Sequence, residues 1–225
     1  MDKIILLQEK IGEWGRGNIR SYPWRYHQEP YPVLISEFML HRTQTRQVLP
    51  VYEKFILRFP TLADYASAGR WEAESILISL GLNWRIAGML NALDEIWRDY
   101  GEVPTDYDKL IAVGGIGQYI AGATICFTLN RPITIVDSNI VRVIGRVYDL
   151  DLRGEARRKK SVITAIRKSV DPVNPRDFYY SIIDLAHLFC RPINPVCWEC
   201  PLRNIPCGYA DKNTQGDKLI SISDK

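Results

Sequence analysis

The sequence predicts an all-α protein, and three features support this prediction. Apolar residues recur at spacings of three and four in several segments, which is the period of an amphipathic helix. Glycine and proline interrupt these segments often, so the helices are joined by short loops. No segment alternates apolar and polar residues for long enough to require a sheet. Residues 133–136 fit either a short strand or a buried extended segment.

The helical periods can be followed along the chain in order. Four sets share the spacing: Ile4, Leu7, Ile11 and Trp14; Val33, Leu34 and Phe38; Val48, Val51, Tyr52 and Phe55; and Leu90, Leu93, Ile96 and Trp97. Breakers such as Pro30, Pro60 and Gly101 separate them. We therefore expect about ten helices.

The helices are expected to form two lobes. The middle lobe covers residues 34–129 and includes two helices joined by a glycine turn at 106–129. The second lobe combines residues 1–33 with 136–211. Residues 212–225 are polar and lack aromatic side chains, so they are expected to form a disordered tail.

Composition is that of an ordinary soluble globular protein, with 225 residues, 46% hydrophobic and 24% charged. The longest apolar runs fall far short of the ~20 residues of a membrane-spanning helix. The chain opens on Met1-Asp2-Lys3 without a secretory signal pattern, so we expect a cytoplasmic, nucleoid-associated protein with no membrane partner. Basic residues gather between Arg153 and Lys168, where they fit either a solvated helix face or a phosphate-binding surface.

Four of the five cysteines form a dense cluster with spacers of six, two and six residues: Cys190, Cys197, Cys200 and Cys207. Thiolates are soft ligands that suit zinc or an iron–sulfur cluster, and four of them complete either kind of site. Zinc ribbons usually pair two Cys-x2-Cys steps, whereas this chain has one, which favours iron–sulfur. Two disulfides are the third alternative and would require an oxidising compartment.

A glycine-rich turn, Val113-Gly-Gly-Ile-Gly117, separates two helical patterns. Glycines allow backbone N–H groups to approach a ligand closely, and the helix that follows adds its positive end, so the turn can bind an anion. Many short glycine turns, however, only reverse the chain. Asp137 follows later, just before another amphipathic pattern, where an aspartate serves either as an N-cap or as a catalytic acid.

The glycine turn, Asp137 and the cysteine cluster together resemble the helix-hairpin-helix DNA glycosylases of the endonuclease III and MutY group. The chain shares further residues with this group: Tyr22-Pro-Trp-Arg25, Pro30-Tyr31, Ser36-Glu37, Met39-Leu40, Thr43-Gln44, Phe59-Pro60, Gly81-Leu82 and Asp184-Leu185. The resemblance spans roughly residues 20 to 210. There are two departures: Gly114 replaces the usual proline of the hairpin, and the last cysteine spacer has six residues instead of five.

The resemblance implies a monomeric enzyme of base excision repair that acts on double-stranded DNA containing a mismatched or damaged base. A carboxylate such as Asp137 would stabilise the oxocarbenium-like transition state or activate water. The target base must be flipped out of the duplex into a pocket. The cysteine cluster would hold a [4Fe-4S] cluster, with zinc as the alternative.

Tyr119 distinguishes the branches of this family. Members that also cut the strand have a lysine there, which forms a Schiff base with the sugar, and a phenol cannot do so. Thymine glycosylases acting on G/T and G/U mismatches have tyrosine, so the resemblance predicts a monofunctional enzyme of that type, without strong AP lyase activity. Adenine glycosylase on A/G or A/8-oxoguanine is one alternative, although the chain lacks the C-terminal domain of MutY enzymes. A non-catalytic lesion-binding protein is the other. Without the family context, Tyr119 fits a helix residue that covers the hairpin.

Other site residues also follow from the resemblance. Glu37 matches a proton donor of the adenine branch, and Asp184 matches a structural acid. Tyr180 is either a wall of the base pocket or a core residue. Expected DNA contacts lie in the hairpin and in two loops: Gly115, Gly117, Gln118, His41, Arg42, Trp84 and Arg85. Of these, Arg42 can pair with the widowed guanine, and Trp84 is either a wedge or a buried residue.

Overall fold

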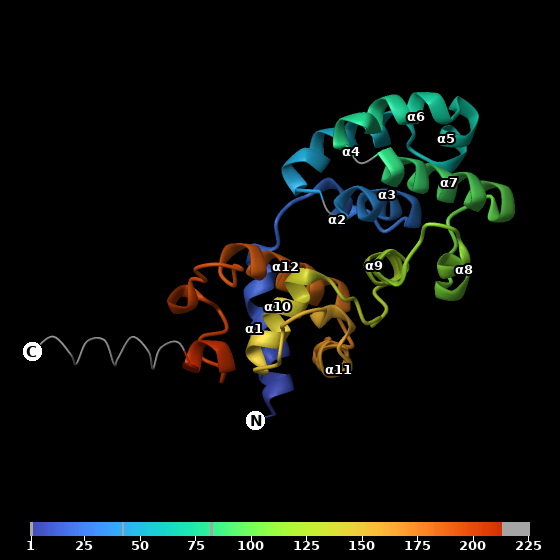
Figure 1. The fold of residues 1–225 in the computed structure, drawn as a ribbon. Coiled ribbons are helices and arrows are strands. Elements are labelled where there is room, and N and C mark those ends of the chain that lie inside the picture. The colour runs from blue at the N-terminus through green and yellow to red at the C-terminus, as the bar shows by residue number, and fades with distance from the viewer. Residues whose placement is uncertain (1, 42, 82, 213–225) are drawn as a thin grey trace, which may run out of the picture. The chain divides into compact units, whose positions relative to one another are not determined.

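The structure is a computed structural model that describes residues 2–41, 43–81 and 83–212, and all regular structure within these ranges is helical (Figure 1). The α-helices are α1 (Lys3–Asn18), α2 (Pro23–Tyr26), α3 (Pro30–Leu40), α4 (Thr45–Arg58), α5 (Leu62–Ala68), α6 (Arg70–Leu77), α7 (Asn83–Tyr100), α8 (Tyr107–Ala112), α9 (Gln118–Leu129), α10 (Ser138–Val147), α11 (Lys160–Ser169) and α12 (Pro175–Leu188). Short 3-10 helices are η1 (Ile78–Leu80), η2 (Ala156–Arg158) and η3 (Cys197–Glu199). The predicted all-α class is confirmed. Within the described ranges, no helix combines the length and apolar character needed to cross a bilayer.

The chain divides into two compact units. Unit 1 comprises Met1–Arg20 and Pro132–Lys225, and unit 2 comprises Ser21–Arg131. The expected first boundary, between residues 33 and 34, was wrong, because the segment before α3 belongs to unit 2. Trp24 of α2 is buried there, and its ring packs edge-on against Tyr52 of α4 at 5.2 Å between centroids.

Unit 2 is built around two helices that are apolar on nearly every face. Residues 31–39 of α3 and 120–128 of α9 are all buried, as expected for helices at the centre of a core. These two helices pack against each other, and α4 packs on α3. As a result, the only acidic residue of α3, Glu37, lies inside the unit beside the first turn of α9.

In unit 1, α12 lies between α1 and α10 and packs against both. The contact with α1 is close: a Cβ atom on Gly15 would lie 2.1 Å from Oγ of Ser181, so only glycine fits. Buried Asp184 of α12 accepts hydrogen bonds from the backbone N and Nε of Arg20, at 2.8 and 2.7 Å, which holds the end of α1.

The expected tail overlaps the described structure at one residue. Lys212 lies in a helical turn, and its Nζ is 2.5 Å from Oδ2 of Asp149. Lys212 is therefore structured, contrary to the prediction. The rest of the predicted tail, residues 213–225, lies outside the described residues.

Candidate active site and DNA-binding residues

The glycine turn between α8 and α9 is shaped by the backbone of α7. Gly115 has a φ of +86°, and a Cβ there would come within 3.1 Å of the Gly88 carbonyl oxygen. The amide of Gly114 donates a 3.1 Å hydrogen bond to Oε2 of Glu95 on α7. This bond explains the departure from the family's proline, because proline has no N–H to donate. The hydrogen bond to Glu95 of α7 holds the turn in place, as the rigid proline ring does in the family pattern.

The N-terminus of α9 has the features of an anion site. Gly117 is its N-cap and offers no capping side chain, and the first helical turn contains no acidic residue. The amides of a first turn have no partner inside the helix. Gly117 and Gln118 are exposed, and a phosphate contact by the amides of this turn stays a prediction.

Tyr119 and Glu37 form a hydrogen-bonded pair in unit 2. The Tyr119 hydroxyl donates to Oε2 of Glu37 at 2.8 Å, and Glu37 is only 3% exposed. The His41 ring lies next to Tyr119, with 6.5 Å between ring centroids. The sequence nominated these three residues separately, and the packing of α3 on α9 brings them together.

Arg85 has a role that the sequence did not suggest. Its side chain is buried, and its guanidinium donates to the His41 carbonyl and, at 2.7 Å, to Oγ1 of Thr43. Arg85 thereby fixes the loop that follows α3, and a DNA contact by this residue stays a prediction. Arg42, expected to contact guanine, lies outside the described residues. Trp84 is 63% exposed, so it is accessible for the wedge role.

Asp137 is the N-cap of α10. Its Oδ1 accepts from the amides of Asn139 at 2.6 Å and Ile140 at 3.2 Å. Oδ2 accepts a longer bond, 3.4 Å, from the Ser138 hydroxyl. The cap fixes the side chain through one oxygen and leaves the other weakly engaged. The structural and catalytic interpretations of Asp137 are therefore compatible.

Tyr179 of α12 supports the segment that leads to Asp137, and the sequence gave no sign of this. Its hydroxyl donates to the Ile133 carbonyl at 2.9 Å and accepts from the Ile135 amide at 3.0 Å. Residues 133–136 are thus not a strand, and within this segment Ile135 is buried while residues 133, 134 and 136 are partly exposed. A tyrosine two positions before Ser181 carries no motif, so only the packing identifies it. Its neighbour Tyr180 is also buried, at 5% exposed.

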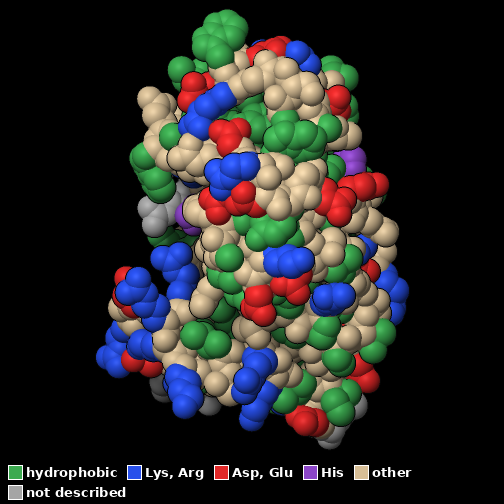
Figure 2. All heavy atoms as spheres, turned by 90° about the vertical axis from the view of Figure 1, so that its right-hand side faces the viewer, with side chains coloured by type: hydrophobic (Ala, Val, Ile, Leu, Met, Phe, Trp, Pro, Cys, Tyr) green, Lys and Arg blue, Asp and Glu red, His purple; other side chains and the backbone are tan. Residues whose placement is uncertain are grey.

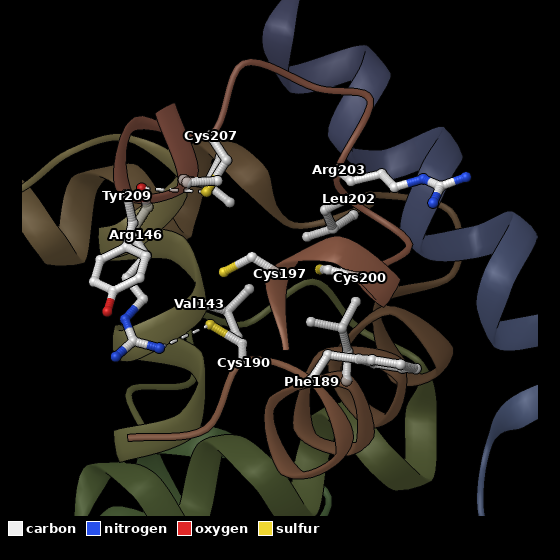
Figure 3. Close-up of a pocket in the computed structure, with 13 residues that line it drawn as sticks. Val143, Arg146, Phe189, Cys190, Cys197, Cys200, Leu202, Arg203, Cys207 and Tyr209 are labelled. Atoms are coloured by element: carbon white, nitrogen blue, oxygen red, sulfur yellow. Dashed lines mark hydrogen bonds between the residues drawn. The ribbon is translucent and has the colours of Figure 1, made fainter. Parts of the chain in front are cut away.

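The four clustered cysteines line one pocket in unit 1 (Figure 3). Cys190 follows α12, Cys197 begins η3, and the spacer before Cys207 folds as two turns closed by Arg203 N to Cys200 O and Ile205 N to Leu202 O. Apolar side chains complete the lining: Val143, Val147, Leu185, Phe189 and Leu202. The extra residue of the last spacer is accommodated by these turns.

The helix that Asp137 caps also holds this pocket in place. Nε of Arg142 donates to the Cys190 carbonyl at 2.6 Å. Arg146 donates to Sγ of Cys190 at 3.4 Å and to the Arg191 carbonyl at 2.7 Å, while its guanidinium stacks 4.2 Å from the Tyr209 ring. Burial raises the pKa of Cys200 to about 11 and also raises that of Cys197. Without a bound metal these thiols are protonated at neutral pH.

Comparison with known proteins identifies the family. No protein-family model matches the chain. A thymine-DNA glycosylase of Aeropyrum pernix is 30% identical over 214 residues, which cover 92% of this chain and 95% of that protein. The chain belongs to the helix-hairpin-helix DNA glycosylase superfamily. A thymine/uracil-DNA glycosylase of Pyrobaculum aerophilum is 29% identical over 94% of this chain and 91% of that protein.

Solved structures of the superfamily share the fold. A thermostable thymine-DNA glycosylase superposes with a TM-score of 0.82 at 26% identity, over 93% of this chain and 97% of that one. A trapped endonuclease III–DNA covalent intermediate superposes with a TM-score of 0.76 at 20% identity, over 95% and 100% of the two chains, and supports the fold alone. An adenine DNA glycosylase of Buchnera aphidicola is 28% identical, and the chain spans 63% of its length.

The donor set of the cysteine pocket fits the cofactor implied by the glycosylase superfamily. The four cysteines form no disulfide, and the pocket lining gathers four sulfurs without a carboxylate or imidazole. Four thiolates suit an iron–sulfur cluster or a structural zinc. Within the described ranges, no three His, Cys, Asp or Glu side chains are placed so that they could hold a single metal ion. The fit of the pocket to a cofactor therefore rests on its four thiol donors and on their position around one pocket.

Proposed function

We propose that this superfamily member is a monofunctional DNA glycosylase of base excision repair that removes thymine or uracil mispaired with guanine. The observation that carries the proposal is Tyr119, positioned just after the hairpin and hydrogen-bonded to buried Glu37. Tyrosine at this position is the feature that the resemblance associates with thymine glycosylases. The names of two relatives that cover most of the chain, the thymine-DNA and thymine/uracil-DNA glycosylases, support the same substrate class.

Tyr119 also supports hydrolysis rather than lyase chemistry. Covalent catalysis at the sugar C1′ requires an amine that can form a Schiff base. A phenol hydroxyl that donates to Glu37 offers no such nucleophile. Water therefore attacks C1′, and the products are a free base and an abasic site in an intact strand.

Asp137 is proposed to stabilise the sugar during base loss. The C1′–N bond breaks with its electron pair leaving on the base, so positive charge develops on the ring. A carboxylate beside this charge lowers the barrier, and it can accept a proton from the water that adds to C1′. The α10 cap holds Oδ1 and leaves Oδ2 for this work.

The Tyr119–Glu37 pair is proposed to assist the leaving base. A departing pyrimidine carries negative charge, which a nearby proton donor stabilises. Glu37 is buried and connected to the half-buried Tyr119, so the pair can deliver or share a proton at the base. Glu37 can equally order the attacking water.

DNA binding is proposed to use the exposed features of unit 2. The first-turn amides of α9, at Gly117 and Gln118, bind a backbone phosphate together with Gly115. Trp84 is exposed and fits the wedge that fills a vacated stack. His41, Arg42 and Arg85 remain proposed DNA contacts, with Arg42 at the widowed guanine, and Tyr180 remains a proposed pocket residue.

The cysteine pocket is proposed to hold a [4Fe-4S] cluster, which would crosslink the segment from Cys190 to Cys207. Its ligands would be Cys190, Cys197, Cys200 and Cys207, with Arg146 donating a hydrogen bond to the first sulfur. Zinc bound by the same thiolates is the alternative. In both cases the role is structural, because the residues proposed for base release lie elsewhere.

A panel of mismatched duplexes tests the proposal. Alkali-labile sites should form in G/T and G/U duplexes, with no adduct trapped by borohydride. Base release only from A/G or A/8-oxoguanine duplexes would indicate an adenine glycosylase instead, a function that the 28% identical Buchnera enzyme has by name. Mismatch binding without release of any base would indicate a lesion-binding protein. A borohydride-trapped adduct would refute monofunctional chemistry.

A further inference from the structure

Positive charge in unit 1 is concentrated in one short segment. Residues 151–168 contain seven basic and two acidic residues, so their net charge of +5 exceeds the +3 of the whole chain. The remainder of the protein is therefore slightly acidic. Five of the seven basic residues stand close together before and at the start of α11, and we call this group the basic arm: Arg153, Arg157, Arg158, Lys159 and Lys160.

The basic arm is an ordered and exposed part of the fold. It runs through η2 into the first residue of α11, with Ala156 and Val162 buried beneath it. Arg153, Arg157, Arg158 and Lys160 are all exposed. Figure 2, which turns the right-hand side of Figure 1 toward the viewer, shows Lys and Arg side chains gathered on the lower part of that face.

Acidic residues neutralise only part of the arm. Asp151 pairs with Arg153 and with Lys159, each at 2.8 Å, and Glu155 pairs with Arg158 at 2.9 Å. Within the described ranges, Arg157 and Lys160 form no ion pair. Two cations of the arm therefore remain without an ion pair.

These two cations do not help the fold. Helix α11 has no acidic residue in its first turn and no capping side chain, so its N-terminal positive end is not neutralised. Cations near that end oppose the helix dipole. Arg167 and Lys168 lie in the last turn, where the same dipole favours them. The helix dipole thus accounts for Arg167 and Lys168 but not for Arg157 and Lys160.

The segment that carries the arm folds back onto α10, the helix that Asp137 caps. Leu152 packs against Gly145, and both η2 and α11 pack on α10. The arm and Asp137 therefore belong to the same compact unit. We propose that the basic arm binds backbone phosphates of the duplex that carries the target base, with Arg157 and Lys160 as its principal contacts. This inference rests on the proposed function, because it takes duplex DNA as the partner.

Matched variants of the full-length protein test the proposal. R157Q/K160Q removes two charges from the arm, and R167Q/K168Q removes two from the other end of α11. Binding is measured against salt concentration on a fully paired duplex of roughly 30 base pairs. For R157Q/K160Q we expect weaker binding and a salt slope reduced by about 1.8, or about 0.9 for each lost phosphate contact. R167Q/K168Q should bind like the unmodified protein.

Two results would overturn the proposal. Equal losses in both variants would show a general effect of net charge. Unchanged binding of R157Q/K160Q would show that the arm does not contact DNA. Thermal unfolding provides the folding control, and the melting temperature of R157Q/K160Q should be unchanged or raised. Base release from G/T duplexes tests the proposed function separately, because the arm is assayed on paired DNA.

Discussion

The hydroxyl of Tyr119 donates a 2.8 Å hydrogen bond to Oε2 of Glu37, a carboxylate that is only 3% exposed. A buried polar group that loses its hydrogen-bond partner costs roughly 1–3 kcal/mol. We expect Tyr119→Phe to lower the free energy of unfolding by an amount in that range and to slow base release. Denaturant unfolding and single-turnover assays measure the two effects.

A double-mutant cycle checks that the effect passes through this pair. Glu37→Gln replaces the carboxyl group that Tyr119 contacts with an amide, so removal of the Tyr119 hydroxyl should then cost less. The coupling free energy should be roughly 1–3 kcal/mol. Additive effects of Y119F and E37Q would contradict the pairing.

Asp137→Asn should separate capping from catalysis. Asparagine caps helices about as well as aspartate, so the free energy of unfolding should change by less than about 1 kcal/mol. Base release should fall by at least roughly a hundredfold, because the carboxylate proposed to stabilise the developing charge is lost. Mismatch binding by gel shift should persist. Asp137→Ala is the comparison, and it should cost a further ~1 kcal/mol of stability through the lost cap. Undiminished base release in D137N would remove Asp137 from the mechanism.

Tyr179→Phe should affect Asp137 through the backbone. The change leaves the buried Ile135 amide without the Tyr179 hydroxyl, which costs about 1–3 kcal/mol of unfolding free energy. Because the segment before Asp137 then loosens, kcat should fall more than KM changes. Tyr148→Phe is the matched control, since its hydroxyl accepts a 3.3 Å bond from Ser169 away from this segment. A Y179F enzyme with normal kcat would show that the Tyr179 hydrogen bonds to Ile133 and Ile135 contribute to stability alone.

Serine at any of the four pocket cysteines should reduce metal content and weaken the fold of unit 1. The expected readout for the unmodified protein is iron with labile sulfide and a visible band near 400 nm, in keeping with the family resemblance. Stoichiometric zinc in a colourless protein would support the alternative. Cys126→Ala is the control, because Cys126 lies in α9 of unit 2 and does not line the pocket.

Metal retention should also depend on pH and should be weaker at low pH. The pKa of Cys200 is raised to about 11 by burial, so metal binding must displace a proton across the neutral range. Falling pH therefore favours the protonated, metal-free thiol, and rising pH favours retention. Metal content after incubation with a chelator at pH 6 and pH 8 checks this, and the loss should be greater at pH 6.

Much of the site could be predicted from local sequence. The hairpin glycines, Asp137 before an amphipathic helix and the cysteine spacing each depend on a few neighbouring residues, since turns, caps and ligand spacing are local properties of the backbone. The helical class followed for the same reason, because the period of three to four residues repeats within each segment. The boundary near residue 33 was misjudged because Trp24 packs on Tyr52, a contact that no local pattern records.

The sequence by itself determined the helical class, the family resemblance and the candidate residues. Only the tertiary structure decided which residues contact one another. It paired Tyr119 with Glu37, directed Arg85 to the loop after α3, and placed Tyr179 against the segment before Asp137. Hydrogen bonds of this kind join residues far apart in the chain, and their geometry depends on how helices pack around a core. Periodicity shows which face of a helix is buried, but the partner it meets is set by the packing.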